Sequence, residues 1–304
     1  MGKTNQTKIP QNRNDIHSPG WAGYELLDSG NQKKLERFGS HRLIRFEKAA
    51  IWKPSLSTKE WEAADAEFTI FKGEKQGSWK FHKTNPRSWS IDVDELKIIL
   101  NISKSRHIGV FPEQLENWRW IEQKLSAWKN KVSILNLFGY TGVATVYAAR
   151  AGASVTHVDA SRKSLEVGKN SLQASNLGER SVRWLCDDVR KFIEREIRRG
   201  NKYDGIIMDP PKFGRGPKGE VWEFNTAALD LINLCGYLLS ESPIMFILTA
   251  YDIDHSPEEI SEWVCNLLKP FSGETEFGNL VQQEKSAGRK ISQASYARWS
   301  PSPL

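Results

Sequence analysis

Short apolar runs separated by polar segments dominate the chain from residue 130 onward. The apolar run 132–138 leads through the turn 139–142 (GYTG) into an Ala-rich, helix-compatible segment at 143–150. A second apolar run, 153–158, is followed by Asp159. Apolar runs of this length, bounded by turn residues, are typical of buried strands, and a helix between two parallel strands forms a right-handed crossover. The pattern therefore predicts a strand, a tight turn, a helix and a second parallel strand.

The same alternation continues toward the C-terminus. Two last strands, about 274–283 and 290–299, are joined by 285–289 and predict a closing hairpin. Five strands alternating with helices before a hairpin predict a Rossmann-like, doubly wound and mostly parallel sheet. The other expected strands are 181–185, 203–208 and 244–249, and the expected helices are 115–129, 161–174, 222–239 and 257–268, with a charged helix that ends at 199.

The chain before this region predicts a tail and a small β-rich subdomain. Residues 1–20 have few apolar side chains and many Asn, Gln and Lys, which is typical of a flexible tail. Residues 21–101 contain short strand-like runs and four tryptophans, which we assign to core packing or domain docking in preference to base stacking. The larger domain is then expected at 102–304. The short runs are 42–46, 67–71, 78–82, 88–91 and 96–100, and the tryptophans are Trp52, Trp61, Trp79 and Trp89.

The composition is that of a globular protein with room for a large α/β domain and an appendage. Of its 304 residues, 39% are hydrophobic and 26% charged, so disorder is not expected. No apolar run approaches the ~20 residues of a membrane helix, and the N-terminus lacks the apolar core of a signal peptide. We therefore expect a cytoplasmic protein with no membrane contact. Cys186, Cys235 and Cys265 lie far apart and in no zinc-like spacing, so neither a disulfide framework nor a metal site is expected.

Basic residues are concentrated near the N-terminus. The net charge is +6, and residues 1–60 contain 11 Lys and Arg against 6 Asp and Glu. A basic surface favours a polyanionic partner such as RNA. The same charges would also keep an exposed segment soluble, and charge alone does not separate the two interpretations.

Polar or glycine-rich groups follow each predicted parallel strand. In a doubly wound sheet, ligands bind at the carboxyl ends of the strands. Gly139 and Gly142 permit unusual backbone dihedrals and a close approach of a ligand to the backbone. Asp159 lies about 20 residues after the first glycine, where an acid can accept hydrogen bonds from both hydroxyls of a ribose. The turn and the acid together predict a nucleoside-containing ligand.

The segment 209–213, Asp-Pro-Pro-Lys-Phe, is the sharpest of these strand ends. The two prolines fix the backbone and remove two N–H donors, which leaves carbonyl oxygens available to a ligand. Asp209 adds an acceptor, and Phe213 offers an apolar face on which a flat substrate can stack. A rigid turn with Phe213 in the core is the alternative, but it gives no reason for the acid at the preceding strand end. We therefore interpret Asp209, Pro210 and Phe213 as catalytic residues.

These motifs together resemble those of the class I S-adenosylmethionine-dependent methyltransferases. The resemblance covers roughly residues 100–300 and is closest to the branch with bacterial large-subunit rRNA cytosine-C5 and guanine-N7 methyltransferases. It implies a seven-stranded class I sheet, S-adenosyl-L-methionine as the cofactor, and RNA as the partner, either rRNA or a ribosomal subunit. A homo-oligomer is left open. The motifs are 136–142 (NLFGYTG), 159–161 (DAS), 187–189 (DDV) and 209–213 (DPPKF), with 107–114 similar to a loop that precedes the fold in that branch.

The resemblance also implies roles for residues at the first two strand ends. Phe138, Gly139 and Thr141 would line the methionine part of the cofactor. Asp159 would hold the ribose, and Ser161 would lie beside it. The glycine turn and the acid that predict a nucleoside are thus the residues to which the family assigns the cofactor.

Further roles follow for later strand ends and for the preceding loop. Asp187 would meet the adenine amine. Asp209 would contact the cofactor and, with Pro210, border the methyl group and the substrate. Phe111 and Gln114, in the loop before the first strand, would contribute to the cofactor site.

One departure from the family bears on the substrate. Members that methylate cytosine C5 use a cysteine after the fifth strand, because that carbon becomes nucleophilic only after a thiolate has attacked C6. This chain has Thr249-Ala250-Tyr251 there, and we interpret its three cysteines as buried structural thiols. A nitrogen target needs no covalent adduct and is favoured. Two alternatives stay open: a non-catalytic RNA-binding protein that retains the fold, and an NAD-dependent oxidoreductase, for which the Gly-x-Gly-x-x-Gly motif is missing.

Overall fold

A nine-stranded sheet carries most of the chain after residue 130. The computed structural model describes residues 11–70, 77–83, 87–128 and 130–302. The strand order is β1-β17-β18-β16-β13-β10-β11-β12, with β2 also paired to β17. The central strands β16, β13, β10, β11 and β12 are parallel, whereas β18 is antiparallel to both its neighbours. The predicted doubly wound sheet of seven strands is confirmed, and two short strands, β1 and β2, are added along its β17 edge.

The strands of this sheet and its helices lie close to the ranges predicted from the sequence. The strands are β1 Gln11–Arg13, β2 Ile16–Ser18, β10 Ser133–Leu137, β11 Ser154–Asp159, β12 Val182–Cys186, β13 Gly205–Met208, β16 Met245–Ala250, β17 Gly273–Gln283 and β18 Lys290–Pro301. The helices are α2 Leu115–Ser126, α3 Val143–Arg150, α4 Arg162–Ala174, α5 Val189–Arg199, α6 Phe224–Gly236 and α7 Pro257–Leu268, with a 3-10 turn, η1, at Pro112–Gln114.

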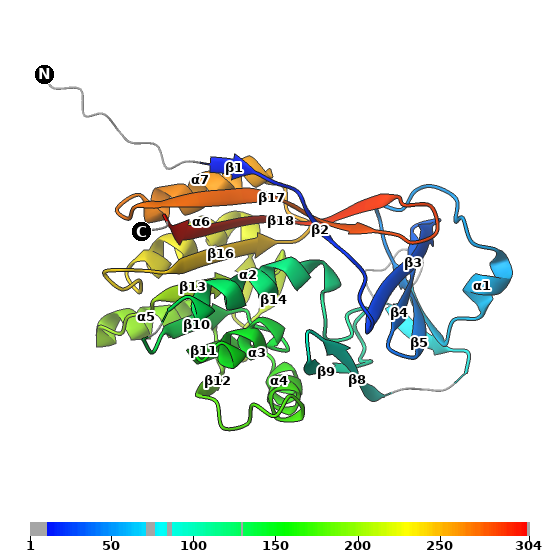
Figure 1. Ribbon diagram of the computed structural model, residues 1–304, viewed down its shortest axis with the longest axis horizontal. Helices are drawn as coiled ribbons and strands as arrows, with labels where there is room; N and C mark the ends of the chain where they lie inside the picture. The colour runs from blue at the N-terminus through cyan, green and yellow to red at the C-terminus, as the bar shows by residue number, and fades with distance from the viewer. Residues whose placement is uncertain (1–10, 71–76, 84–86, 129, 303–304) are drawn as a thin grey trace, which may run out of the picture.

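Helices cover both faces of the sheet (Figure 1). Helices α5, α6 and α7 pack on one face, and α2, α3 and α4 pack on the other. Helix α5 shows why: its buried residues, Val189, Phe192, Ile193 and Glu196, recur at the spacing of one helical face. Among the described residues, no helix has both the length and the apolar character needed to cross a membrane.

The strand order reverses next to β10. From β10 the chain moves outward to β11 and β12, and it then returns to β13 and continues in the opposite direction to β16. Helices that follow β10 and β13 consequently lie on opposite faces, and a crevice opens between the two strand ends. The turn after β10 and the segment after β13, which the sequence singles out, therefore meet at the same place.

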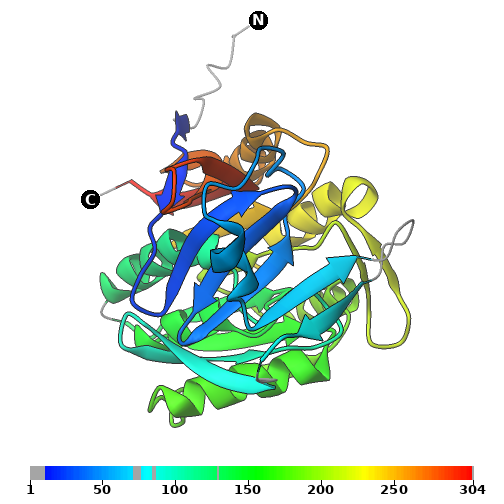
Figure 2. The ribbon, with the colours of Figure 1, turned by 90° about the vertical axis from the view of Figure 1, so that its right-hand side faces the viewer.

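A second, smaller sheet precedes the large one (Figure 2). Its five strands are ordered β3-β4-β5-β6-β7, and a separate hairpin, β8–β9, packs against α4. The predicted β-rich region is present, but the sequence did not predict β3 and β4. The elements are β3 Tyr24–Gly30, β4 Lys33–Phe38, β5 His41–Phe46, α1 Thr58–Glu62, β6 Ala66–Ile70, β7 Gly77–Phe81, β8 Ser88–Val93 and β9 Leu96–Asn101.

Strand β4 escapes prediction because it buries charged side chains. Glu36 is fully buried and Lys34 is 6% exposed, so charged side chains interrupt the buried apolar positions of the strand. Arg45 from β5 donates two hydrogen bonds of 2.7 Å to the Glu36 carboxylate, and the Tyr24 hydroxyl donates another of 2.9 Å. Although burial opposes ionisation, Arg45 and Lys34 hold the pKa of Glu36 below its ordinary value. At least two of the basic residues counted near the N-terminus therefore serve this cluster and not the surface.

We expect Glu36→Ala to destabilise the fold by about 3–5 kcal/mol, because it leaves the Arg45 guanidinium buried without its carboxylate. Urea unfolding followed by tryptophan fluorescence measures the loss. Glu166→Ala is the matched control, since the Glu166 carboxylate pairs with Lys169 on an exposed helix face and should contribute less than about 1 kcal/mol. Equal losses in the two variants would contradict this account of the cluster.

The hairpin β17–β18 joins the two sheets. It runs from the edge of the large sheet out to the small one (Figure 1). At its far end the Gln282 side chain donates to the Tyr24 hydroxyl at 2.7 Å, and Arg289 donates to Asp28 at 3.0 Å. The backbone N–H of Lys285 donates to the carbonyl of Leu26 at 2.9 Å. The hairpin tip thus provides hydrogen-bond partners for the residues of β3.

Residues 11–18 differ from the predicted flexible tail. They form β1 and β2, which pair in parallel with β17. The strands are three residues long and largely polar, so local sequence gave no signal, and the ladder hydrogen bonds to β17 fix their conformation. Residues 1–10 of that tail lie outside the described part of the chain. The hairpin β8–β9, before residue 102, packs against α4, and the tip of the hairpin β17–β18, after it, contacts β3. The boundary at 101/102 therefore stays a prediction.

Candidate functional site

A cleft lies over the carboxyl ends of the parallel strands and encloses about 2150 Å³. A smaller pocket of about 50 Å³ continues beneath it. Of the residues predicted from the sequence, Gly139 and Gln114 line only the smaller pocket. The others all line the cleft and are brought together by the fold: Phe111, Phe138, Thr141, Asp159, Ser161, Asp187, Asp209, Pro210 and Phe213.

The turn after β10 is held in an uncommon backbone conformation. Phe138 and Tyr140 have φ values of 55° and 51°, although neither is glycine, and Gly142 has φ 76°. Such conformations persist only where the surroundings over-determine them, and they occur often at ligand sites. Gly139 has a further reason to be glycine, because a Cβ there would lie 2.3 Å from the ring of His157 beneath the turn.

His157 is part of a buried polar group under this turn. Its Nδ1 lies 2.9 Å from the Thr145 hydroxyl, which accepts a 2.8 Å hydrogen bond from the Asn136 amide. All three side chains are at most 1% exposed. Burial lowers the pKa of His157 to about 3, so the imidazole is neutral at physiological pH. The group supports the turn from below and brings no charge to the cleft.

Asp159 ends β11 and faces the turn. Its carboxylate accepts hydrogen bonds of 2.8 Å from the backbone N–H groups of Tyr140 and Ser161. Burial raises the pKa of Asp159, and these two N–H groups oppose that effect. Each oxygen accepts one of these hydrogen bonds and can accept another, and Asp159 lines the cleft, so the carboxylate can accept hydroxyl donors from a ligand.

Ser161 and Asp187 occupy the next helix and strand ends. Ser161 caps α4, and its hydroxyl accepts from the N–H of Ser164 at 3.2 Å. Asp187 follows β12; its carboxylate pairs with Arg195 and accepts from the N–H of Asp188 at 2.9 Å. Both residues line the cleft, but these contacts within the chain already use part of their hydrogen-bonding capacity.

The loop before η1 forms one wall of the cleft. The Thr141 hydroxyl donates to the carbonyl of Gly109, which ties this loop to the glycine turn. The ring of Phe111 lies 5.7 Å from that of Tyr140 and 5.2 Å from that of Tyr251. Thr141 is thus turned to the loop as well as lining the cleft, and Phe111 is the centre of an aromatic wall.

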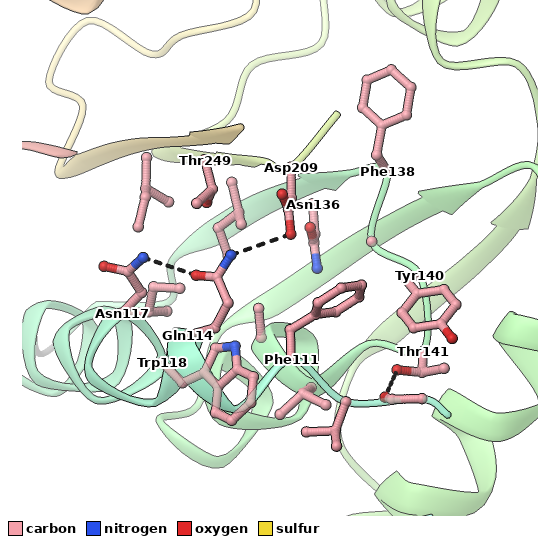
Figure 3. Close-up of a pocket in the computed structure, with 18 residues that line it drawn as sticks. Phe111, Gln114, Asn117, Trp118, Asn136, Phe138, Tyr140, Thr141, Asp209 and Thr249 are labelled. Atoms are coloured by element: carbon pink, nitrogen blue, oxygen red, sulfur yellow. Dashed lines mark hydrogen bonds between the residues drawn. The ribbon is translucent and has the colours of Figure 1, made fainter. Parts of the chain in front are cut away.

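Asp209 follows β13 and lines both the cleft and the smaller pocket. Its Oδ1 is buried and has no hydrogen-bond partner among the described residues, while its Oδ2 accepts from the Gln114 amide at 3.3 Å (Figure 3). Desolvation, with a smaller contribution from the negative charge of Glu113, raises the pKa of Asp209 to about 8. A buried acceptor that is left unpaired costs folding free energy, and such groups are typical of sites where a ligand supplies the partner.

The segment after Asp209 continues into a short hairpin that was not predicted from the sequence. Strands β14, Phe213–Arg215, and β15, Val221–Glu223, form it. The side chain of Phe213 is 60% exposed at the rim of the cleft, so the alternative of a core phenylalanine is wrong. Phe138 packs instead against Trp222, at 4.8 Å between ring centres.

No cysteine lines the cleft, although all three lie in the described part of the chain. Cys235 and Cys265 are buried, whereas Cys186 is only half-buried, so the expectation of three buried thiols is wrong for Cys186. The thiol of Cys186 donates a hydrogen bond to the backbone carbonyl of Ala160 at 3.4 Å. Tyr251, after the fifth parallel strand, lines the cleft where a cytosine-C5 enzyme would carry its nucleophile.

Comparison with known proteins decides the family. Residues 59–227, more than half of the chain, match the family model described as S-adenosylmethionine-dependent methyltransferase. The chain belongs to the S-adenosylmethionine-dependent methyltransferase family. The predicted enzyme class and cofactor are thereby confirmed, and the nicotinamide alternative is wrong.

Similar proteins cover different shares of this methyltransferase. A ribosomal RNA large subunit methyltransferase I from Shewanella denitrificans is 32% identical over 231 residues, which are 72% of this chain and 54% of the relative. A crystal structure of a SAM-dependent methyltransferase from Agrobacterium tumefaciens is 37% identical, with a TM-score of 0.91 over 99% of this chain and 98% of that one. A putative SAM-dependent methyltransferase from Streptococcus mutans shares the fold at 16% identity, with a TM-score of 0.68 over 92% and 75%. The chain spans 39–54% of the length of the curated relatives that it matches.

The hydrogen-bond acceptors and the size of the cleft both fit S-adenosylmethionine. Acidic side chains stand at three successive strand ends, where ribose hydroxyls and amines can donate to them. Its volume exceeds the roughly 300–1,000 Å³ of small-molecule sites, which leaves room for a second substrate beside the cofactor. Asp159 and Asp187 follow β11 and β12, on one side of β10. Asp209, with its unpaired Oδ1, follows β13 on the other side of β10.

Several residues of the site were not predicted from the sequence. Tyr140 and Tyr251 contribute aromatic faces, and Glu113 and Asn117 lie beneath the cleft as buried polar groups. Asn117 interrupts the apolar face of α2, between Leu115 and Trp118, and such an interruption is a signal that could have been used. Glu113 carried no comparable signal, because its burial results from contacts with distant strands.

Proposed function

We propose that this methyltransferase transfers the methyl group of S-adenosylmethionine to a nitrogen of a nucleobase in RNA. The proposal rests on one observation: the described cleft contains an acceptor without a hydrogen-bond partner, Asp209 Oδ1, and no cysteine. In its ionised form, which prevails above its pKa of about 8, the Asp209 carboxylate can orient a nitrogen that bears a hydrogen and can take its proton, whereas carbon C5 would need a thiolate. A nitrogen target therefore agrees with the groups present.

In this proposal the strand-end acids hold the cofactor. Asp159 accepts the ribose hydroxyls, with Ser161 beside it, and Asp187 faces the adenine. Phe138, Gly139 and Thr141 border the methionine part. S-adenosylmethionine supplies a methyl group on a positively charged sulfur, which leaves the protein to position the nitrogen and to receive a proton.

The substrate side of the proposal rests on the other wall of the cleft. Pro210 and the exposed ring of Phe213 lie beyond Asp209 and offer surfaces for a flat base. Five basic side chains also line the cleft without a carboxylate partner among the described residues, and they can contact phosphates. The name of the Shewanella relative supports RNA as the substrate class. The five are Arg87, Lys104, Arg106, Lys163 and Arg215.

Nucleoside mass spectrometry tests the proposal. RNA from cells that lack the gene, both naked and within ribosomal subunits, is incubated with the protein and with S-adenosylmethionine labelled in its methyl group. We expect the label in a nucleoside methylated on nitrogen, and we expect Asp209→Asn to abolish it. A label on carbon would overturn the nitrogen target. No label on any RNA, from protein shown to bind the cofactor, would overturn the RNA substrate and favour a non-catalytic binder.

A further inference from the structure

A chain of side-chain hydrogen bonds leads from Asp209 into the interior of the protein. Gln114 donates through Nε2 to Asp209 Oδ2 at 3.3 Å, and Asn117 donates through Nδ2 to Gln114 Oε1 at 2.8 Å (Figure 3). Gln114 and Asn117 are 5% and 1% exposed. Both amides are therefore shielded from water and depend on these partners to satisfy their polar atoms.

An ion pair anchors the far end of this chain. Arg298, on β18, donates through Nη1 to Asn117 Oδ1 at 3.2 Å. The same guanidinium donates to the carboxylate of Glu276, on β17, at 2.9–3.3 Å. A guanidinium can only donate, so the Asn117 oxygen must face it and the Asn117 amide nitrogen must face Gln114. The orientation of each amide is thus fixed from the ion pair outward.

The fixed amide of Gln114 has two acceptors on its nitrogen side. Besides Asp209 Oδ2, the Gln114 Nε2 group donates to the hydroxyl oxygen of Tyr251 at 3.1 Å. If the amide were reversed, its nitrogen would face the amide nitrogen of Asn117, and its oxygen would offer no donor to the Asp209 carboxylate. In the orientation that Asn117 imposes, one oxygen of Asp209 is held and the other, Oδ1, is left free.

We propose that Gln114 is a positioning residue for Asp209 and not a cofactor ligand. The chain Glu276, Arg298, Asn117 and Gln114 orients the Asp209 carboxylate so that Oδ1 faces the target nitrogen. This inference rests on the proposed function only for the identity of that target. It replaces the role that the sequence suggested for Gln114, whose amide nitrogen already donates to Asp209 and Tyr251.

The charge state of Asp209 gives a readout that needs no RNA. The groups that face its carboxylate are Glu113 and Gln114 from η1 and Tyr251 from the end of β16. Glu113 raises the pKa of Asp209, whereas the Gln114 hydrogen bond lowers it. Lys34 and Arg45 act one step away, because they lower the pKa of Glu113 against the effect of its burial. Removing the Gln114 donor must therefore move the titration of Asp209 to higher pH.

The test measures this titration in the full chain. Carbon-13 NMR of protein labelled at the aspartate carboxyl groups, with Asp209→Asn to assign the signal, should give a midpoint near 8 in the unaltered protein. We expect Gln114→Glu to raise that midpoint by about one unit or more, since it replaces a donor by a like charge. Asn117→Asp should also raise it, because it keeps the contact with Arg298 but no longer donates to Gln114. A midpoint unchanged in both variants would overturn the proposal.

Kinetics on the methylated substrate separate positioning from cofactor binding. We expect Asn117→Asp to lower kcat about 10- to 100-fold, which corresponds to one lost hydrogen bond to a charged group, and to leave the Kd for S-adenosylhomocysteine within about twofold. A Kd that rises in step with the loss of kcat would overturn the proposal. Gln173→Glu, on the exposed side of α4, is the matched control and should change neither value.

Misfolding is separated from loss of positioning by a further variant. Gln114→Leu has a similar volume and no hydrogen-bonding group, so it removes the donor without adding a charge. A thermal unfolding curve identifies which variants are folded, and the folded ones are titrated. If no RNA is methylated but the Asp209 midpoint shifts as expected, the positioning role stands and the proposed function fails. If methylation succeeds without the shift, the reverse holds.

Discussion

The Asp209→Ala variant should lose methyl transfer almost completely while it binds S-adenosylmethionine about as well as the unaltered protein. Asp209 presents the only carboxylate oxygen in the described cleft that is both buried and without a partner. Its loss removes the acceptor for the target nitrogen, and such groups contribute about 10²- to 10⁴-fold to rates. In the proposed function the cofactor is held by Asp159, Asp187 and the glycine turn, which lie on other strand ends, so its affinity should change little.

Two measurements decide this expectation: the rate of label transfer from S-adenosylmethionine and the Kd for S-adenosylhomocysteine by calorimetry. The midpoint of thermal unfolding should stay the same or rise, because the variant removes a buried carboxyl group whose Oδ1 is unpaired. Asp230→Ala serves as the control, since Asp230 is exposed and pairs only with Arg190 on the outer helices. Normal methylation by Asp209→Ala would show that the site assignment is wrong.

Gly139→Ala should damage both the cofactor site and the fold. The added Cβ would lie 2.3 Å from Cε1 and 2.6 Å from Nδ1 of His157. The imidazole is fully buried and hydrogen-bonded to Thr145, so the turn must move instead. We expect a loss of about 1–3 kcal/mol of stability from overpacking, together with at least tenfold weaker binding of S-adenosylhomocysteine.

A double-mutant cycle isolates the contact. Adding His157→Ala to Gly139→Ala removes the ring that the new Cβ meets, so the two changes together should cost less than the sum of their separate effects. Gly178→Ala is the control, because the nearest atom to its Cβ, Gln173 Cγ, is 3.9 Å away. Additive losses in the cycle would mean that the ring of His157 is not what restricts this position.

Much of the large sheet could be predicted because its strands are buried on both faces. Parallel strands covered by helices appear as continuous apolar runs, and β16, all six residues of which are buried, is the clearest case. The helices α3 and α7 have the bounds that the sequence predicted, since glycine ends the turn before α3 and a Ser-Pro capping box opens α7. At the starts of these two helices the local sequence signals were strong.

Part of the small sheet and the chain of side-chain hydrogen bonds that leads to Asp209 could not be predicted, because they depend on contacts between distant residues. Strand β4 buries two charged side chains, and the pairing of Glu36 with Arg45 makes the burial of Glu36 possible. The sequence suggested a cofactor role for Gln114, but the role proposed from the structure depends on Asn117 and on Arg298, which is 181 residues beyond Asn117 in the chain. No local pattern in the sequence contains that contact.

The hairpin β17–β18 also constrains when the protein can become complete. Tyr24 and Asp28 belong to β3, yet partners for them come from residues 282–289, which are made much later. During synthesis from the N-terminus, the small sheet must wait for the ribosome to deliver these residues before its buried polar groups are satisfied. The small sheet and the hairpin therefore mature together, and the small sheet is not an independent module that could be exchanged between enzymes without the hairpin.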